Sequence, residues 1–302
     1  MDPRILDRLR CPVCGDPLAE ATAGTARALR CPRRHSFDIA RQGYVNLLAG
    51  RAPHVGDSAE MVAARADFLA AGHYAPVATA LADAARRVLH RPAPVTPAPA
   101  GRPGGAGPGC PLVADAGAGT GWYLAAVLAA LPDAVGLALD VAKPALRRAA
   151  RAHPRAAAAL ADTWQRLPLA DGSTTVLLNV FAPRNGAEFR RVLDPAGALL
   201  VVTPAEEHLA ELVGPLDLLR VDPAKADRVA GSLGGHFTEE SSAVHRARLA
   251  LTRTEVATLV GMGPSAWHTD PARLAERIAA LPEPATVTLA VRLGVHRPYA
   301  AS

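Results

Sequence analysis

Short apolar runs alternate with helical patterns through the second part of the chain. The runs that read as strands are Leu112–Ala116, Val135–Leu139, Val176–Val180, Leu199–Val202 and Ala285–Leu293. Between them, Trp122–Leu131 and Pro144–His153 have the composition and spacing of helices, which a closed β-sandwich would not leave between its strands. This alternation is typical of a parallel sheet covered by helices, so we expect an α/β, Rossmann-like fold.

Two helical patterns precede this region and end in a segment that no regular element can occupy. Ser58–Phe68 and Tyr74–Leu89 show helical apolar spacing, and Asp57 or Ser58 is placed to cap the first helix. Residues 91–111 contain seven prolines and five glycines. We therefore predict a helical bridge over residues 51–90 and an exposed Pro/Gly-rich loop over residues 91–111.

Length and composition favour one large domain with a smaller appendage. The chain has 302 residues, half of them apolar, yet no apolar run approaches the roughly 18 residues of a membrane span. The segment Met1–Arg10 is charged and lacks the features of a secretory signal, so a cytoplasmic protein is expected.

The positive charge lies mostly at the N-terminal end. The net charge is +5, and residues 1–56 hold nine arginines against five acidic residues. Only two of the 33 basic residues are lysines, Lys143 and Lys225, a bias typical of a GC-rich genome. The distribution of the charge therefore says more about a polyanionic partner than the choice of arginine does.

Three cysteines and a histidine have the spacing of a metal site. Cys11 and Cys14 are followed, after sixteen residues, by Cys31 and His35. Two such knuckles can surround one tetrahedral ion, and thiolate and imidazole ligands suit Zn²⁺. Four protein ligands leave no open position, so we expect a structural zinc; a disulfide is the alternative, which a cytoplasmic location disfavours. Cys110 has no partner nearby in the sequence.

The segment after the second knuckle, residues 36–48, has two interpretations. Arg41, Tyr44 and Asn46 could give an RNA surface its phosphate contact, base stacking and hydrogen bonding. Alternatively, these polar residues are simply solvated. In both cases we expect apolar neighbours to pack against the zinc knuckles, namely Phe37, Ile39, Val45 and Leu47.

A glycine loop follows the first predicted strand of the sheet. Asp115, Gly117, Gly119 and Gly121 form the pattern Asp-x-Gly-x-Gly-x-Gly between a strand and a helix. Glycines allow a sharp turn and close approach of a ligand, and the helix that follows presents free N–H groups. A dinucleotide loop would instead need glycine at the position of Trp122. The spacing therefore favours another adenosyl ligand, S-adenosylmethionine.

Acidic residues at neighbouring strand ends support the same ligand. Asp115 can lie beside the cationic methionine part of S-adenosylmethionine, which has no pyrophosphate to repel. Asp140, nineteen residues past Gly121, ends the second strand and can accept the ribose hydroxyl protons. Asp162 follows a third strand, near the expected position of the adenine amino group. Each aspartate alone could be a helix cap, but together with the glycine loop they predict a cofactor site.

The fourth strand ends at the same edge, in the segment 179–185. Phe181 could stack on a target base, and Asn179 or Arg184 could orient it. A core phenylalanine beside a turn at Pro183 is the simpler interpretation. No histidine or carboxylate is marked by its spacing as the proton acceptor, so the catalytic residues are unknown at this stage.

Assembled, these motifs resemble the large-subunit ribosomal RNA guanine-N1 methyltransferases of the RlmA type, and within them the tylosin-resistance members. The resemblance extends over nearly the whole chain. It depends on Cys11-Pro-x-Cys14, Cys31 to His35, Phe37-Asp38-x-Ala40, residues 43–48, Asp67 to Tyr74, the glycine loop, Leu139-Asp140, Phe181-Ala-Pro183, Thr203-Pro204, His208-Leu-x-Glu-Leu212 and Met262-Gly-Pro-Ser-x-Trp267.

The resemblance implies ligands, partners and a target. It implies zinc on the four predicted ligands and S-adenosylmethionine contacts from Tyr74, Gly119, Thr120 and His208, of which the tyrosine and the histidine carry no signal of their own. It also implies a homodimer that grips a hairpin of 23S rRNA, with the target guanine in the loop near the peptide exit tunnel and the macrolide site. Many relatives have Cys-Gly-Glu-Gly where this chain has Ala118 to Gly121, so a charge is missing from that contact.

The resulting expectation is an S-adenosylmethionine-dependent 23S rRNA (guanine-N1)-methyltransferase that contributes to tylosin-type resistance. We expect a zinc-binding RNA-recognition module over residues 1–50 and a class I methyltransferase domain over residues 112–302. Two alternatives remain at this point. One is a methyltransferase of a small natural product, which would turn over without RNA, and the other is an RNA-binding protein that has lost catalysis.

Overall fold

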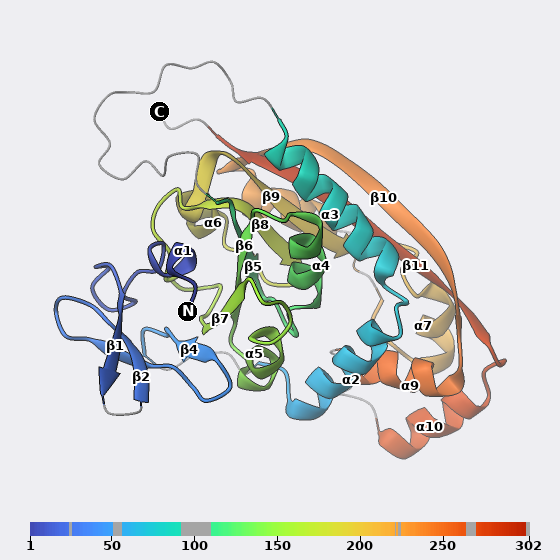
Figure 1. The fold of residues 1–302 in the computed structure, drawn as a ribbon. Helices are drawn as coiled ribbons and strands as arrows, with labels where there is room; N and C mark the ends of the chain where they lie inside the picture. Colours follow the sequence, from blue (N-terminus) through green and yellow to red (C-terminus); the bar gives the residue numbers. More distant parts are fainter. Residues whose placement is uncertain are drawn as a thin grey trace.

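Eight strands of the computed structural model form one mixed sheet in the order β10-β11-β9-β8-β5-β6-β7-β4 (Figure 1). Neighbouring strands from β9 to β4 run parallel, whereas β11 and β10 join antiparallel beside β9. The bounds are β4 (Tyr44–Asn46), β5 (Leu112–Ala116), β6 (Val135–Asp140), β7 (Ala156–Leu160), β8 (Thr174–Val180), β9 (Leu193–Pro204), β10 (Phe237–Leu251) and β11 (Ala285–Pro298). The expected Rossmann-like sheet is confirmed, with an antiparallel edge that the apolar runs did not predict.

The structure describes residues 1–23, 26–50, 56–91, 110–220, 222, 225–263 and 270–299. Most of the predicted Pro/Gly-rich loop, residues 92–109, lies outside these ranges, as do residues 264–269 of the C-terminal motif. Within them, no helix is both long and apolar enough to cross a membrane.

Helices cover both faces of the sheet and bury two apolar layers. One layer packs α2 (Ala59–Ala70), α3 (Ala75–Leu89), α4 (Trp122–Ala130), α5 (Lys143–Ala149), α7 (Ala210–Leu216), α9 (Arg253–Gly261) and α10 (Pro271–Ala279). The other packs α1 (Pro3–Leu6), α6 (Gly186–Val192) and α8 (Lys225–Leu233). All five residues of β5 are buried, as expected of a central parallel strand covered on both faces.

The first of the two predicted bridge helices begins as the sequence indicates. Ser58 is its N-cap, because its side-chain oxygen accepts a hydrogen bond of 3.2 Å from the Met61 N–H. Asp57, the other candidate cap, instead forms an ion pair with Arg65 one turn into the helix. This ion pair becomes important at the site described below.

The N-terminal residues form a small sheet whose chain then enters the large one. β1 (Ala19–Ala23), β2 (Ala26–Arg30) and β3 (Ser36–Asp38) pair antiparallel. β4 leaves them and pairs parallel with β7, and the Leu47 N–H continues this pairing with a 3.0 Å hydrogen bond to the Leu160 carbonyl. The zinc-module segment therefore supplies the edge strand of the large sheet.

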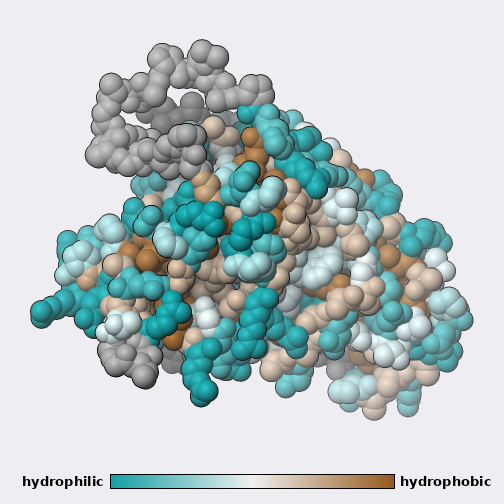
Figure 2. All heavy atoms as spheres, in the orientation of Figure 1, coloured by the Kyte–Doolittle hydropathy of each residue, from teal (hydrophilic) through white to brown (hydrophobic). Residues whose placement is uncertain are grey.

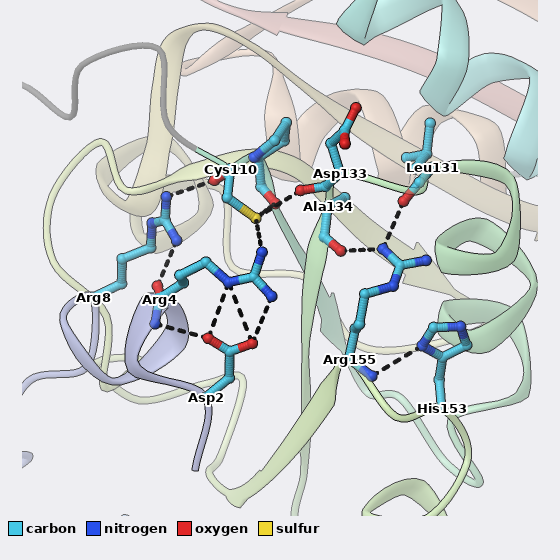
Figure 3. Close-up of polar contacts among 10 residues, drawn as sticks. Asp2, Arg4, Arg8, Cys110, Leu131, Asp133, Ala134, His153 and Arg155 are labelled. Carbon is cyan, nitrogen blue, oxygen red and sulfur yellow. Dashed lines mark hydrogen bonds and ion pairs between the residues drawn. The ribbon is translucent and has the colours of Figure 1, made fainter.

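Polar contacts around Cys110 join the N-terminal segment to the start of β5 (Figure 3). The Arg8 guanidinium donates to the Cys110 carbonyl at 2.7 Å, and the Arg4 guanidinium lies 3.4 Å from the Cys110 sulfur. The thiol in turn contacts the Asp133 carbonyl at 2.7 Å. Cys110, which has no sequence neighbour to pair with, therefore has polar contacts across this junction.

Candidate active site and metal centre

Cys11, Cys14, Cys31 and His35 lie together, with their ligand atoms within 4.8 Å of one another. The Cys14 and Cys31 sulfurs are 3.7 Å apart, and His35 Nδ1 lies 3.3 Å from the Cys31 sulfur and 3.5 Å from that of Cys11. A tetrahedral ion with Zn–S bonds of about 2.3 Å separates two sulfurs by about 3.8 Å. The four groups therefore fit one zinc ion, and the sulfurs are too far apart for a disulfide.

Two tight turns hold these ligands in place. In the first, the Gly15 N–H donates to the Cys11 carbonyl at 2.8 Å, and Gly15 has a φ of +78°. In the second, the Arg34 N–H donates to the Cys31 carbonyl at 2.9 Å, although Arg34 has a φ of +67° and is not glycine. Because all four positions around an ion would be filled by protein, the site suits a structural metal.

The segment after the knuckles packs as expected but leaves less for RNA than the sequence suggests. Val45 and Leu47 are buried in the cluster that contains Cys11 and Cys31, and Phe37 and Ile39 pack against it. Arg41 is exposed. Tyr44 is only 8% exposed and belongs to the main core. Its predicted role in base stacking is therefore wrong in this conformation, because pairing of β4 with β7 turns the ring inward.

The glycine loop adopts the backbone that its sequence requires. Gly117, Gly119 and Gly121 all have positive φ values, between +54° and +84°. A Cβ on Gly117 would lie 2.4 Å from that of Ala182, and one on Gly121 would lie 2.9 Å from the Ala149 Cα, so neither position admits a side chain. The loop therefore passes close to both the β8 end and α5.

Asp115, Asp140 and Asp162 lie at the carboxyl ends of three neighbouring strands, as predicted: Asp115 is the last residue but one of β5, Asp140 ends β6 and Asp162 follows β7. Asp115 is 1% exposed, and neither of its side-chain oxygens has a hydrogen-bond partner among the residues that the structure describes. Burial, followed by the nearby charge of Asp140, raises the pKa of Asp115 to about 8. A buried carboxyl group without partners is costly, so it is most simply explained as facing a ligand that is cationic or donates hydrogen bonds.

The other two acids are partly engaged by the backbone. Asp140 accepts 2.8 Å hydrogen bonds from the N–H groups of Gly119 and Ala142, and burial nevertheless raises its pKa. Asp162 accepts from the Trp164 N–H at 2.9 Å, while its second oxygen is buried without a partner. Asp140 thus fixes the glycine loop and still has carboxylate lone pairs for hydroxyl donors.

Three rings from distant segments meet beside this edge. The Tyr74 hydroxyl lies 3.4 Å from His208 Nε2, and Phe181 stacks on His208 at a centroid distance of 6.1 Å. His208 Nδ1 accepts from the Ala290 N–H at 3.3 Å, so in a neutral ring the proton is on Nε2. The structure thus brings together Tyr74 and His208, which the sequence singles out only through the resemblance.

The segment after β8 separates its three candidate residues into different environments. Phe181 is 41% exposed and has a φ of +52°, so it is not the core phenylalanine of the simpler interpretation. Asn179 is buried and its amide donates to the Ala116 and Pro183 carbonyls at 3.2 and 2.8 Å, which braces β8 against β5. Burial lowers the pKa of Arg184, whose Nε is buried without a partner.

One residue near the glycine loop has no signal in the sequence. Arg65, on α2, lies beside Gly119, because a Cβ on that glycine would be 3.6 Å from the Arg65 Nη1. It is one of many arginines in the chain and the single arginine of α2. Its position depends on how α2 packs, which no local pattern encodes.

A parallel sheet with a glycine loop and acids at its carboxyl edge, joined to a Cys₃His cluster, defines the class: a class I methyltransferase with a zinc ribbon. A family model described as "RlmA, N-terminal", a zinc ribbon, matches residues 9–52. The 23S rRNA (guanine(748)-N(1))-methyltransferase of Streptomyces fradiae is 49% identical, over 99% of both chains. A protein of Micromonospora griseorubida, named as a candidate 23S rRNA (guanine-N(1)-)-methyltransferase, is 68% identical over 99% of this chain and 100% of its own.

This chain therefore belongs to the RlmA-type family of 23S rRNA (guanine-N1)-methyltransferases. The likeness continues at greater distance in Bacillus subtilis (strain 168), where the relative YxjB is 29% identical over 85% of this chain and 86% of its own. The methyl donor of this class is S-adenosylmethionine, and the buried carboxylate oxygens and the glycine loop at the carboxyl edge suit such a ligand. The zinc-bearing ribbon is likewise confirmed by the family match and by the geometry of its four ligands.

Proposed function

We propose that this protein transfers a methyl group from S-adenosylmethionine to N1 of a guanine in a hairpin loop of 23S rRNA, and so contributes to tylosin-type macrolide resistance. One observation carries the proposal: the match to the S. fradiae enzyme runs over 99% of both chains, through the zinc ribbon and the methyltransferase sheet alike. The name of that enzyme gives guanine 748 as its target, and we propose the same nucleotide here.

The donor site is proposed to comprise Asp115, Asp140, Asp162 and the glycine loop. The unpartnered oxygens of Asp115 suit the cationic methionine part, Asp140 suits the ribose hydroxyls and Asp162 suits the adenine amino group. Gly117, Gly119 and Thr120 would line the donor along the loop, and Tyr74 and His208 would close it from the side of α3 and α7. Bound S-adenosylmethionine supplies an electrophilic methyl group on a sulfonium.

The target base is proposed to enter beside Phe181. This ring is exposed at the end of β8, next to Tyr74 and His208, and can stack on an unstacked guanine. Transfer would break the S–CH₃ bond and form the N1–CH₃ bond, and the proton of N1 would pass to water. Most of the rate acceleration would then come from holding N1 in line with the methyl group. His208 acts as a hydrogen-bond donor in this arrangement, since its Nδ1 already accepts from the backbone.

The N-terminal module over residues 1–50 is proposed to hold the RNA hairpin. Hydrophilic side chains predominate over this module on the face shown in Figure 2. Six of its arginines are exposed: Arg4, Arg27, Arg30, Arg33, Arg34 and Arg41. Such residues favour a polyanionic backbone. We propose that two copies grip the hairpin as a homodimer, that residues 51–90 bridge the module to a catalytic domain over residues 112–302, and that the protein acts in the cytoplasm.

The test uses purified protein, S-adenosylmethionine and a 23S rRNA transcript that contains the hairpin, followed by primer extension. Methylation at N1 blocks base pairing, so a new stop is expected at one guanine. A transcript with adenine at that position is the matched control and should show no stop. Methyl transfer to a macrolide in the absence of RNA, or a protein that binds RNA but never methylates it, would refute the proposal.

A further inference from the structure

The side chain of Arg65 lies against the glycine loop at the place where the donor's amino-acid part would meet it. Its Nη1 and Cδ lie 3.6 and 3.7 Å from the position of a Cβ on Gly119. The N–H of the same glycine donates to Asp140, so Arg65 and Asp140 flank one turn of the loop. The Arg65 side chain is 28% exposed and is therefore within reach of a ligand from solvent.

Two groups hold the guanidinium in this position. Nη1 pairs with the Asp57 carboxylate just before α2, and Nη2 donates to the Met262 carbonyl at the end of α9 at 2.9 Å. A guanidinium has five N–H donors in a planar fork, so these two contacts leave donors for a third partner. The side chain is thus oriented before any ligand arrives, which reduces the entropy lost on binding.

The aspartates near the glycine loop can balance only the positive charges of a zwitterionic amino acid, not its carboxylate. Asp115 suits a cationic group and Asp140 suits hydroxyl donors, but ionised carboxylates at these positions and at Asp57 repel another carboxylate. Arg65 is the cation beside Gly119 that opposes these charges. Burial raises the pKa of Asp140, the hydrogen bonds from the Ala142 and Gly119 N–H groups lower it, and of the smaller effects the charge of Asp57 raises it and that of Arg65 lowers it. A carboxylate bound beside Gly119 would find its counter-charge in Arg65.

We propose that Arg65 binds the α-carboxylate of S-adenosylmethionine, an inference that rests on the proposed function. The guanidinium keeps its contact with the Met262 carbonyl and turns its remaining N–H groups to the carboxylate. Asp57 holds the fork in place in the ligand-free protein and shares it when the donor binds. Arg65 is thus a ligand-binding residue, contributed by the bridge helix rather than by the sheet.

The test compares two ligands that differ only in this group: S-adenosylmethionine and its decarboxylated analogue, S-adenosylmethioninamine. Their dissociation constants are measured by calorimetry with the full chain and with Arg65→Met. The variant is expected to lose about 10- to 100-fold in affinity for S-adenosylmethionine, the effect of a charge-assisted hydrogen bond, and less than about threefold for the analogue. Arg65→Lys, which keeps the charge without the fork, should fall between.

Two control variants separate a carboxylate contact from a structural role. Arg86→Met removes an arginine of α3 that pairs with Asp83 and should leave both affinities unchanged. Asp57→Asn removes one of the two anchors of Arg65 but keeps the Met262 contact, so it should lower the affinity for S-adenosylmethionine relative to the analogue by less than Arg65→Met does. Thermal unfolding of each variant without ligand identifies any that fails to fold, and Arg65→Lys then carries the comparison.

The outcomes distinguish this inference from the proposed function. If Arg65→Met weakens the binding of both ligands equally, Arg65 only supports the loop and the inference is overturned. The inference is also overturned if Asp57→Asn lowers the affinity for S-adenosylmethionine relative to the analogue as much as Arg65→Met does. Unchanged binding of both ligands overturns it as well. If the unaltered protein binds neither ligand, the proposed methyl donor fails first, and the assignment of Arg65 fails with it.

Discussion

Replacing Asp115 by asparagine should stabilise the ligand-free protein increasingly as the pH rises. Burial, and then the charge of Asp140, raises the pKa of Asp115 to about 8, against an ordinary value of 3.8. Between these values the carboxyl group is ionised in the unfolded chain and neutral in the folded one. The wild-type free energy of unfolding therefore falls by about 1.4 kcal/mol per pH unit on account of this group, or about 6 kcal/mol over the whole interval. Asparagine has the same shape and does not ionise, so it escapes this loss.

The measurement is urea-induced unfolding of both proteins at pH 6, 7 and 8 without S-adenosylmethionine. The difference in free energy of unfolding should grow in favour of Asp115→Asn by about 2 kcal/mol from pH 6 to pH 8. Asp83→Asn, at an exposed position on α3, is the control and should give a nearly constant difference. A constant difference for Asp115→Asn would show that Asp115 is already ionised in the folded protein, and the reasoning from its burial would be refuted.

The same substitution should have the opposite effect on ligand binding. A cationic donor favours the ionised carboxylate, so binding below pH 8 should release a proton from Asp115. Calorimetry in two buffers of different ionisation enthalpy measures that proton. Asp115→Asn should bind S-adenosylmethionine more weakly and release correspondingly fewer protons; equal proton release from both proteins would show that Asp115 does not face the donor.

Three further substitutions test separate parts of the site. Cys14→Ser should release the metal and unfold the N-terminal module, because a structural zinc contributes about 10 kcal/mol or more to such modules; metal analysis that finds full occupancy would contradict this. Asp140→Ala should weaken S-adenosylmethionine binding at least about tenfold in calorimetry while the fold persists in circular dichroism, and an unchanged affinity would mean that the ribose lies elsewhere. Phe181→Ala should raise the KM for the RNA hairpin by about 5- to 150-fold, the value of one base stack, with little change in donor affinity; equal losses for donor and RNA would assign Phe181 to the donor site.

The parts of the fold that the sequence predicts are those that local patterns encode. The central strands are continuous apolar runs because both of their faces are buried, and the glycine loop is recognisable because its backbone excludes other residues. β10 is not predicted, since all of its residues from Thr238 to Val244 are exposed and an alternation of exposed and less exposed positions begins only at His245. β4 is too short, at three residues, to be recognised as part of the large sheet.

The residues of the site are likewise predictable from the sequence only where a local pattern determines their position. The metal ligands and the three aspartates follow from spacing, because turns and strand ends determine where they lie. Tyr74 and His208 are 134 residues apart in the chain, and the tertiary fold alone brings them together. Arg65 is of the same kind: its role depends on the packing of α2 against α9 and the glycine loop, and neither composition nor periodicity distinguishes it from the other arginines.

The pairing of β4 with β7 makes the zinc ribbon a structural part of the catalytic sheet rather than a detachable attachment. A protein that lacked residues 1–50 would leave the edge of β7 bare, a run of four alanines and a leucine with unpaired N–H and carbonyl groups. Such an edge invites self-association, so the shortened enzyme should aggregate even where every donor-binding residue is intact. A ribbon from another protein would have to bring its own matching strand before it could retarget this methyltransferase to a different RNA.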